Sequence, residues 1–293
     1  MPSLKEVRNR ISSVSSTRQI TSAMKLVSAS KLKRAQDNIT RMRPYADKLK
    51  EILGNLSGAV SSDTESPYAE QREAKRILLV VVTANKGLCG AFNANVIKRA
   101  SAFLEEHAAQ VKSGNLELIC IGRKASGFFS KRDVKVRAQF DEVVDKPTFA
   151  NANGIAELIM GLFAEKVFDK VYIVYNEFRS AASITTVVDN YLPITSSDDK
   201  SQASAATTDY IYQPSKEEIV YNLIPASLKT QFFKVILDSQ AAEHGARMTA
   251  MHKATDNAGE LLKELKLSYN KARQAAITNE ILEIVGGAEA LNG

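Results

Sequence analysis

A glycine-containing turn at residues 83–95, TANKGLCGAFNAN, has the residue types most suggestive of chemistry in this chain. It follows an apolar, β-branched run and precedes a predicted helix, the position at which dinucleotide-binding folds hold a phosphate. However, Gly87 and Gly90 fit neither G-x-G-x-x-G nor G-x-x-x-x-G-K-[ST], and Lys86 precedes the first glycine. Because the position fits but the motifs do not, a nucleotide-binding Rossmann-type enzyme is kept only as an alternative. We favour a tight structural turn at Gly87, Cys89 and Gly90 that uses the backbone freedom of glycine.

The other candidates for catalysis or metal binding lack suitable neighbours in the sequence. Cys89 could be an activated thiol at a helix N-terminus, but no histidine is near it. The three histidines are scattered, and His244 and His252 lie eight residues apart without a Glu-His pair. Two cysteines make neither a disulfide framework nor a four-ligand site. We therefore expect no catalytic residue, no cofactor site and no metal site.

Positive charge is concentrated near the N-terminus. Residues 1–50 contain six Lys and six Arg against Glu6, Asp37 and Asp47, a net charge of +9. Since the whole chain carries +6, the remainder carries −3. Such a segment suits an acidic protein surface, a nucleic acid or an anionic membrane face, although a solvated helix face is the simpler interpretation. A nucleic-acid-binding coiled-coil protein stays a second alternative, but no aromatic residue is interleaved before Tyr45.

The composition does not suggest a membrane-spanning chain. Hydrophobic residues make up 44% and charged residues 25%, and no window holds eighteen consecutive apolar residues. A secretory signal is not expected, because Lys5, Arg8 and Arg10 interrupt any apolar core. The amphipathic pattern also continues beyond the length of a cleavable transit peptide.

Two long helical patterns flank the middle of the chain. Residues 226–285 contain no proline, and their apolar and small residues recur in steps of three and four, on one side of a helix. Sixty helical residues would span roughly 90 Å, so this helix must project and needs a partner along its length. Residues 3–56 show similar spacing, with Pro44 inside and Gly54 and Gly58 at the end. We expect the two to form a long antiparallel two-helix coiled coil.

The seam of the N-terminal helix becomes polar in its middle. Four successive seam positions there are polar, namely Arg18, Thr21, Lys25 and Ser28. The apolar residues move one position back, to Ile20, Met24 and Val27. This drift indicates either local rewinding of the helix pair or a different partner in the middle.

The middle of the chain predicts an inserted Rossmann-like α/β domain. Apolar runs predict buried strands at 77–83, 116–122 and 171–178, with further strands at 134–140, 183–194 and 210–215. Helices are predicted at 92–112, 123–131 and 151–168, the last capped by Asn151 or Asn153. This order implies a mostly parallel sheet with helices on both faces and an edge or antiparallel strand at 183–194.

The predicted fold class is therefore α/β plus all-α. We place the N-terminal coiled-coil helix at 1–57, the Rossmann-like domain at 75–213 with a mobile loop at 195–209, and the C-terminal coiled-coil helix at 214–293.

Four separated motifs are similar to those of one known family and occur in the same order. ITNEILEIVGGAEA at 277–290 resembles the C-terminal signature of the gamma subunits of F-type ATP synthases. Three further stretches also match that family: residues 10–36, the Gly-Leu-Cys-Gly turn at 87–90, and residues 246–258. The resemblance covers the whole chain. It departs at the turn, where Lys86 and Ala91 replace the family's usual Arg and Gly.

The resemblance implies a rotor. In that family the coiled coil is a central shaft inside a ring of three alpha and three beta subunits, and the α/β domain grips the epsilon subunit and the membrane c-ring. Proton flow turns the shaft, whose asymmetry drives ATP synthesis or hydrolysis at the beta sites. The chain would then be a non-catalytic subunit with no nucleic-acid partner, at the cytoplasmic face of a bacterial inner membrane and attached only through the complex. An initiator methionine directly before the first helix favours a bacterial over an imported protein.

The resemblance also implies which residues meet the ring. On the basic helix, residues that pass acidic loops of the beta subunits would be Arg8, Arg10, Arg18, Met24 and Lys25. Polar contacts in the C-terminal segment would come from Arg273, Gln274, Thr278 and Glu280. An apolar sleeve, in which a shaft can turn without fixed hydrogen bonds, would enclose Ile277, Ile281, Ile284 and Leu291.

Overall fold

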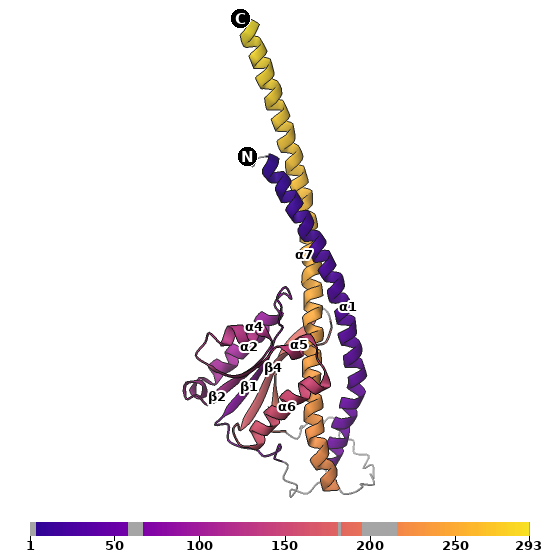
Figure 1. Ribbon diagram of the computed structural model, residues 1–293, viewed down its shortest axis with the longest axis vertical. Helices are drawn as coiled ribbons and strands as arrows, with labels where there is room; N and C mark the ends of the chain where they lie inside the picture. Colours follow the sequence, from indigo (N-terminus) through magenta and orange to yellow (C-terminus); the bar gives the residue numbers. More distant parts are fainter. Residues whose placement is uncertain (1–3, 58–66, 181–182, 195–215, 293) are drawn as a thin grey trace. The chain divides into compact units, whose positions relative to one another are not determined.

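The computed structural model describes residues 4–57, 67–180, 183–194 and 216–292 (Figure 1). Two long helices, α1 (Leu4–Ser57) and α7 (Lys216–Asn292), enclose an α/β region in the sequence. The shorter helices are α2 (Phe92–Glu106), α3 (Ala108–Lys112), α4 (Arg123–Phe129), α5 (Glu142–Asp145) and α6 (Phe149–Ala164). The strands are β1 (Ile77–Val82), β2 (Leu116–Ile121), β3 (Lys135–Phe140), β4 (Lys170–Phe178) and β5 (Ile184–Leu192). Within these ranges, no helix has the length and apolar character needed to cross a membrane.

The strands form one mixed sheet in the order β3-β2-β1-β4-β5. β3, β2, β1 and β4 run parallel, whereas β5 lies at an edge and is antiparallel to β4. β1 and β2 are buried along their whole length, as strands covered on both faces must be. The predicted mostly parallel sheet, with an antiparallel or edge strand at 183–194, is confirmed.

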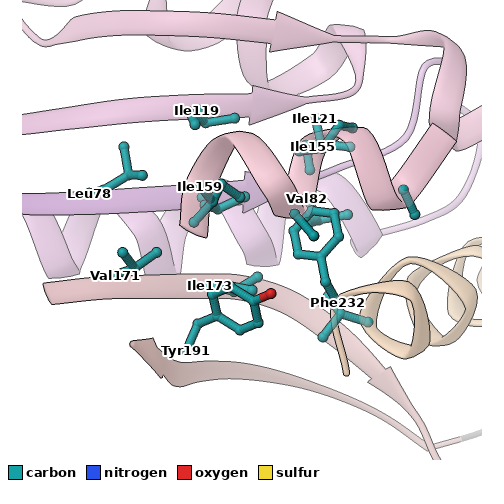
Figure 2. Packing of buried hydrophobic residues seen from close by; sticks show 14 of the residues in the cluster. Leu78, Val82, Ile119, Ile121, Ile155, Ile159, Val171, Ile173, Tyr191 and Phe232 are labelled. Carbon is teal, nitrogen blue, oxygen red and sulfur yellow. The ribbon is translucent and has the colours of Figure 1, made fainter. Parts of the chain in front are cut away.

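Helices cover both faces of this sheet and create two apolar cores. On one face, α6 and the 228–236 part of α7 pack against the even-numbered side chains of β1. Figure 2 shows Ile155 and Ile159 of α6 beside the strands, and Phe232 of α7 beside Val82 and Tyr191. On the other face, α2 and α4 pack against the odd-numbered side chains of β1. The alternation of β1 side chains between the two cores follows from the two-residue period of a strand.

The chain divides into two compact units, and each long helix contributes to both. The helical unit contains residues 4–29 and 247–292, and its buried side chains are Val7, Thr21, Ser28, Met251, Ala258 and Leu262. The α/β unit contains residues 30–246. There, Ile39, Met42 and Ala46 of α1 lie beside Lys234 and Leu237 of α7.

Several boundaries inside the α/β unit differ from the sequence prediction, including those of α6, which spans Phe149–Ala164 instead of 151–168. The helix expected at 92–112 is two helices, because His107 leaves the helical conformation with φ −114° and ψ 34°. The predicted cap of α6 at Asn151 or Asn153 is wrong. Thr148 is the cap, since its backbone is extended and its side chain accepts a hydrogen bond from Asn151 N at 3.2 Å.

Gly54 does not end the first long helix as predicted, whereas both prolines lie inside the long helices. α1 continues through Gly54 to Ser57, and Pro44 lies inside it without ending it. Pro225 lies inside α7. The predicted helix end at Gly58, the loop at 195–209 and the short strand at 210–215 fall outside the described residues.

Candidate functional site

The turn after β1 is closed by its own side chains. Asn93, in the first turn of α2, accepts a hydrogen bond from Ala84 N at 2.9 Å. Its Nδ2 donates to Cys89 Sγ at 3.2 Å and reaches Lys86 O at 3.5 Å. Phe92 N donates to Cys89 O at 3.2 Å. The side chain of Asn93 thus connects the end of β1 to the turn through hydrogen bonds, a role that the sequence did not predict.

The glycines of this turn are not equivalent. Gly90 has φ 58° and Leu88 has φ 61°, so both lie in the left-handed region that favours glycine. Gly87 lies outside that region, and a Cβ added there would meet no atom within 4 Å. The backbone conformation therefore favours glycine at Gly90 but not at Gly87.

The ends of β1 and β2 approach each other closely. Gly122 has φ 93°, and a Cβ there would lie 2.2 Å from the carbonyl oxygen of Thr83. The Thr83 hydroxyl accepts a hydrogen bond from Ala125 N at 2.9 Å, which fixes the start of α4. Only glycine at position 122 permits this approach.

A polar network links three strand ends at the same edge of the sheet. Asn85 Nδ2 donates to Asp141 O and to Asp145 Oδ2, each at 2.8 Å, and Asn85 Oδ1 accepts from Arg123 N at 3.0 Å. Arg123 Nε lies 3.3 Å from Asp141 Oδ2. A phosphate site needs backbone N–H groups directed at the ligand, whereas those of Ala84 and Arg123 serve internal bonds. The arrangement favours a structural turn.

Neither cysteine is placed for thiolate chemistry. Cys89 and Cys120 are both buried. Burial, followed by the charge of Asp141, raises the pKa of Cys120 to about 12, and a thiol with so high a pKa is a poor nucleophile near neutral pH. Across the described ranges, no group of three His, Cys, Asp or Glu residues is placed to hold a metal ion.

A hollow of about 530 Å³ lies in the α/β unit, lined by aromatic side chains that include Tyr45, Phe149 and Tyr221. Lys229 supplies a cation to its wall, but Lys229 Nζ lies 2.6 Å from Glu157 Oε1. That hydrogen bond lowers the pKa of Glu157. The described residues that line the hollow include no Asp, Glu, His or Cys.

In the helical unit, two of the four polar seam positions of α1 are buried. Thr21 is 9% and Ser28 is 3% exposed, whereas Ile20 and Val27, one position earlier, are 59% and 58% exposed. At these two positions the seam keeps its phase, and the apolar residues beside them are exposed. Of the α1 residues matched to ring contacts, Arg8, Arg10 and Arg18 are exposed, while Met24 and Lys25 are half-buried.

The last part of α7 is exposed on every side. The half-buried seam of α7 ends at Ala272, and residues 273–288 are all exposed. This stretch holds Arg273, Gln274, Thr278 and Glu280, together with the predicted apolar residues Ile277, Ile281 and Ile284. The side chain of Leu291 lies outside the described residues. The structure thus brings these residues together along one terminal segment of α7, which we call the tip (residues 273–288).

Two further large apolar side chains at the tip were not selected from the sequence. Leu282 is 63% and Val285 is 53% exposed. Leu282 was missed because it lies off the stripe formed by Ile277, Ile281 and Ile284, whereas Val285, four residues after Ile281, continues that stripe. Exposure of apolar side chains on more than one face marks the tip as an interaction surface, since such patches are costly in water.

Comparison with known proteins gives consistent matches along the whole chain. The sequence profile of the ATP synthase family matches residues 3–291. The chain is 55% identical over 293 residues to the ATP synthase gamma chain of Flavobacterium johnsoniae, covering 100% of both chains. It is 52% identical over 299 residues to the ATP synthase gamma chain of Cytophaga hutchinsonii, again covering 100% of both.

Solved structures show a similar fold at low sequence identity. A chain of the Euglena gracilis mitochondrial ATP synthase matches with a TM-score of 0.67 at 20% identity, covering 98% of this chain and 94% of that one. A chain from the central stalk and c-ring of the Tetrahymena thermophila mitochondrial ATP synthase matches with a TM-score of 0.58 at 23% identity, covering 80% and 99%.

Proposed function

The chain belongs to the ATP synthase gamma-chain family, and from that membership we propose that it is the central-stalk rotor subunit of a bacterial F-type ATP synthase. In this role it couples proton flow through the membrane ring to ATP synthesis or hydrolysis on other subunits. The observation that carries the proposal is the 55% identity to a gamma chain over the full length of both proteins. The exposed apolar tip supports it, because such a surface needs an enclosing partner.

The proposed architecture is a long antiparallel coiled coil with an inserted Rossmann-like domain. Helix spacing and the hydrogen bond between Thr21 and Thr255 support the coiled coil. Four parallel strands lie in the order β3-β2-β1-β4, so the sequence order of neighbouring strands reverses at β1. This switch point supports the Rossmann-like assignment. We propose domain limits of 1–57, 75–213 and 214–293.

The proposed partners are three alpha and three beta subunits, the epsilon subunit and the membrane c-ring. Two matched Euglena gracilis mitochondrial ATP synthase structures, an OSCP/F1/c-ring assembly and a rotor, support this set. The subunit itself would be non-catalytic, because the nucleotide sites of the family lie on the ring. It would lie at the cytoplasmic face of the bacterial inner membrane and be held there only through the complex.

Two groups of side chains are proposed to meet the alpha/beta ring. The basic group on α1 contains Arg8, Arg10, Arg18, Met24 and Lys25, and its exposed guanidinium groups would attract acidic loops over a range set by the Debye length, about 8 Å in physiological salt. Attraction of this kind tolerates rotation better than interlocked packing does. The tip group contains Arg273, Gln274, Ile277, Thr278, Glu280, Ile281 and Ile284, with Leu291 beyond it.

Substitution of Met24 tests this proposal. Met24 is half-buried and adjoins Lys25 on the basic helix. Met24→Lys should add an ion pair to a beta-subunit loop and so impair coupling, measured as fewer protons pumped per ATP in reconstituted vesicles. Asn38→Lys, an exposed position on the same helix, is the matched control. Unchanged pumping per ATP in Met24→Lys would count against the proposed contact.

A further inference from the structure

Two threonine hydroxyls join the helices of the helical unit. Thr21 Oγ1 and Thr255 Oγ1 lie 2.9 Å apart. Each also has a partner in its own helix, because Thr21 Oγ1 donates to Arg18 O at 3.1 Å and Thr255 Oγ1 lies 2.7 Å from Met251 O. A hydroxyl carries one proton. Thr255 can therefore donate either to Thr21 or to Met251 O, but not to both at once.

The cross-helix bond can consequently open without leaving a polar group unsatisfied. When it opens, the Thr255 proton turns to Met251 O, while Thr21 keeps its bond to Arg18 O. The penalty that normally opposes the loss of a buried hydrogen bond is the desolvation of an unpaired group, and here that penalty is absent. Ser28, one heptad along the seam, follows the same pattern, since it is buried and donates within its own helix to Met24 O at 2.7 Å.

Apolar burial around this contact comes mainly from α7. Met251 and Ala258, four residues before and three after Thr255, are 5% and 8% exposed. On α1, Ile20 and Val27 are exposed, whereas Val7, nearer the start of the helix, is 2% exposed. Because burial of apolar surface is the main force that holds two helices together, the polar stretch of α1 contributes less to holding the pair than the end near Val7 does.

We propose that the Thr21–Thr255 pair is a releasable contact, at which the two helices of the helical unit separate and re-form. When closed, it adds a directional bond that keeps the helices in register. When open, it permits a small twist or slide at low cost, because both hydroxyls remain satisfied. The proposal depends on the geometry of the helical unit alone, so it can fail without affecting the proposed function.

Hydrogen exchange of the full-length chain tests the proposal. The variant is Thr21→Val with Thr255→Val, which keeps side-chain shape and replaces both hydroxyls with methyl groups. A releasable contact predicts slower amide exchange in peptides covering residues 18–28 and 251–259, on the order of tenfold, because apolar burial then opposes opening. Thr17→Val is the matched control, since Thr17 Oγ1 is exposed and bonds only to Ser13 O at 3.0 Å among the described contacts.

The exchange rates of the variants distinguish a contact that opens readily from one that holds the two helices together. Exchange in the double variant that equals or exceeds the wild-type rate would overturn the proposal, because the hydroxyl pair would then be the stronger link. The single variants give the same decision if the double variant does not fold. Thr21→Val and Thr255→Val should each exchange more slowly than the wild type, and exchange at or above the wild-type rate in either one would overturn the proposal.

Discussion

Replacement of Gly122 by alanine should be among the more damaging single changes in the α/β unit. Gly122 has φ 93° and ψ 141°, a region that residues with a Cβ rarely adopt. Holding alanine there costs about 1–3 kcal/mol. The added Cβ would also lie 2.2 Å from Thr83 O, a backbone atom at the end of β1 that cannot turn aside. Relief of that overlap requires a backbone shift, which costs roughly another 1–3 kcal/mol.

The two costs together predict a loss of about 2–6 kcal/mol for Gly122→Ala, a large share of the roughly 5–15 kcal/mol by which domains are stable. Urea unfolding of the full-length chain, followed by far-ultraviolet circular dichroism, measures this loss. Gly127→Ala is the control. Gly127 lies inside α4, and an added Cβ there meets nothing within 4 Å, so alanine should be neutral or stabilising by up to about 1 kcal/mol. A loss below about 1 kcal/mol for Gly122→Ala, or an equal loss for Gly127→Ala, would refute the reasoning.

Two further predictions concern charge and thiol reactivity. Burial opposes ionisation of Glu117, but hydrogen bonds from Lys135 and Arg137 at 2.7 and 2.9 Å outweigh it and hold the pKa of Glu117 below its ordinary value. The stabilisation from a lowered pKa is fully present above the ordinary value of 4.5 and is lost as pH falls through the folded pKa. Glu117→Gln should therefore cost about 1–2 kcal/mol near pH 6 and less near pH 3 in urea unfolding. An equal cost at both pH values would contradict this. Cys89 and Cys120 are 1% and 0% exposed, so a thiol reagent should label them only as the chain unfolds. Rapid labelling of Cys89 in the native chain would contradict this and would show that the turn after β1 opens.

The sequence predicted the long helices and the parallel sheet because periodic patterns extend over many residues. Steps of three and four defined α1 and α7, and the uninterrupted β-branched run defined β1. Local details depended on contacts between distant residues and could not be obtained this way. Thr148 became the α6 cap through its backbone conformation. Gly122 requires glycine only because β1 brings Thr83 against it.

For the candidate site, the sequence predicted the tip of α7 better than the seam of α1. The exposed tip agrees with the apolar stripe at Ile277, Ile281 and Ile284, because residues beyond the α7 seam have no facing side chain in the described chain. The drift of the α1 seam allowed two explanations. The structure keeps Thr21 and Ser28 buried and leaves Ile20 and Val27 exposed, although apolar content alone would have favoured the reverse.

Purification of the native complex from membranes tests the central claim most directly. If the chain is the rotor of an F-type ATP synthase, it should be recovered in one copy beside three copies each of two larger ATP-binding subunits, as quantitative mass spectrometry of the intact complex can determine. Recovery of the chain without those subunits, or in a ratio equal to theirs, would contradict the account.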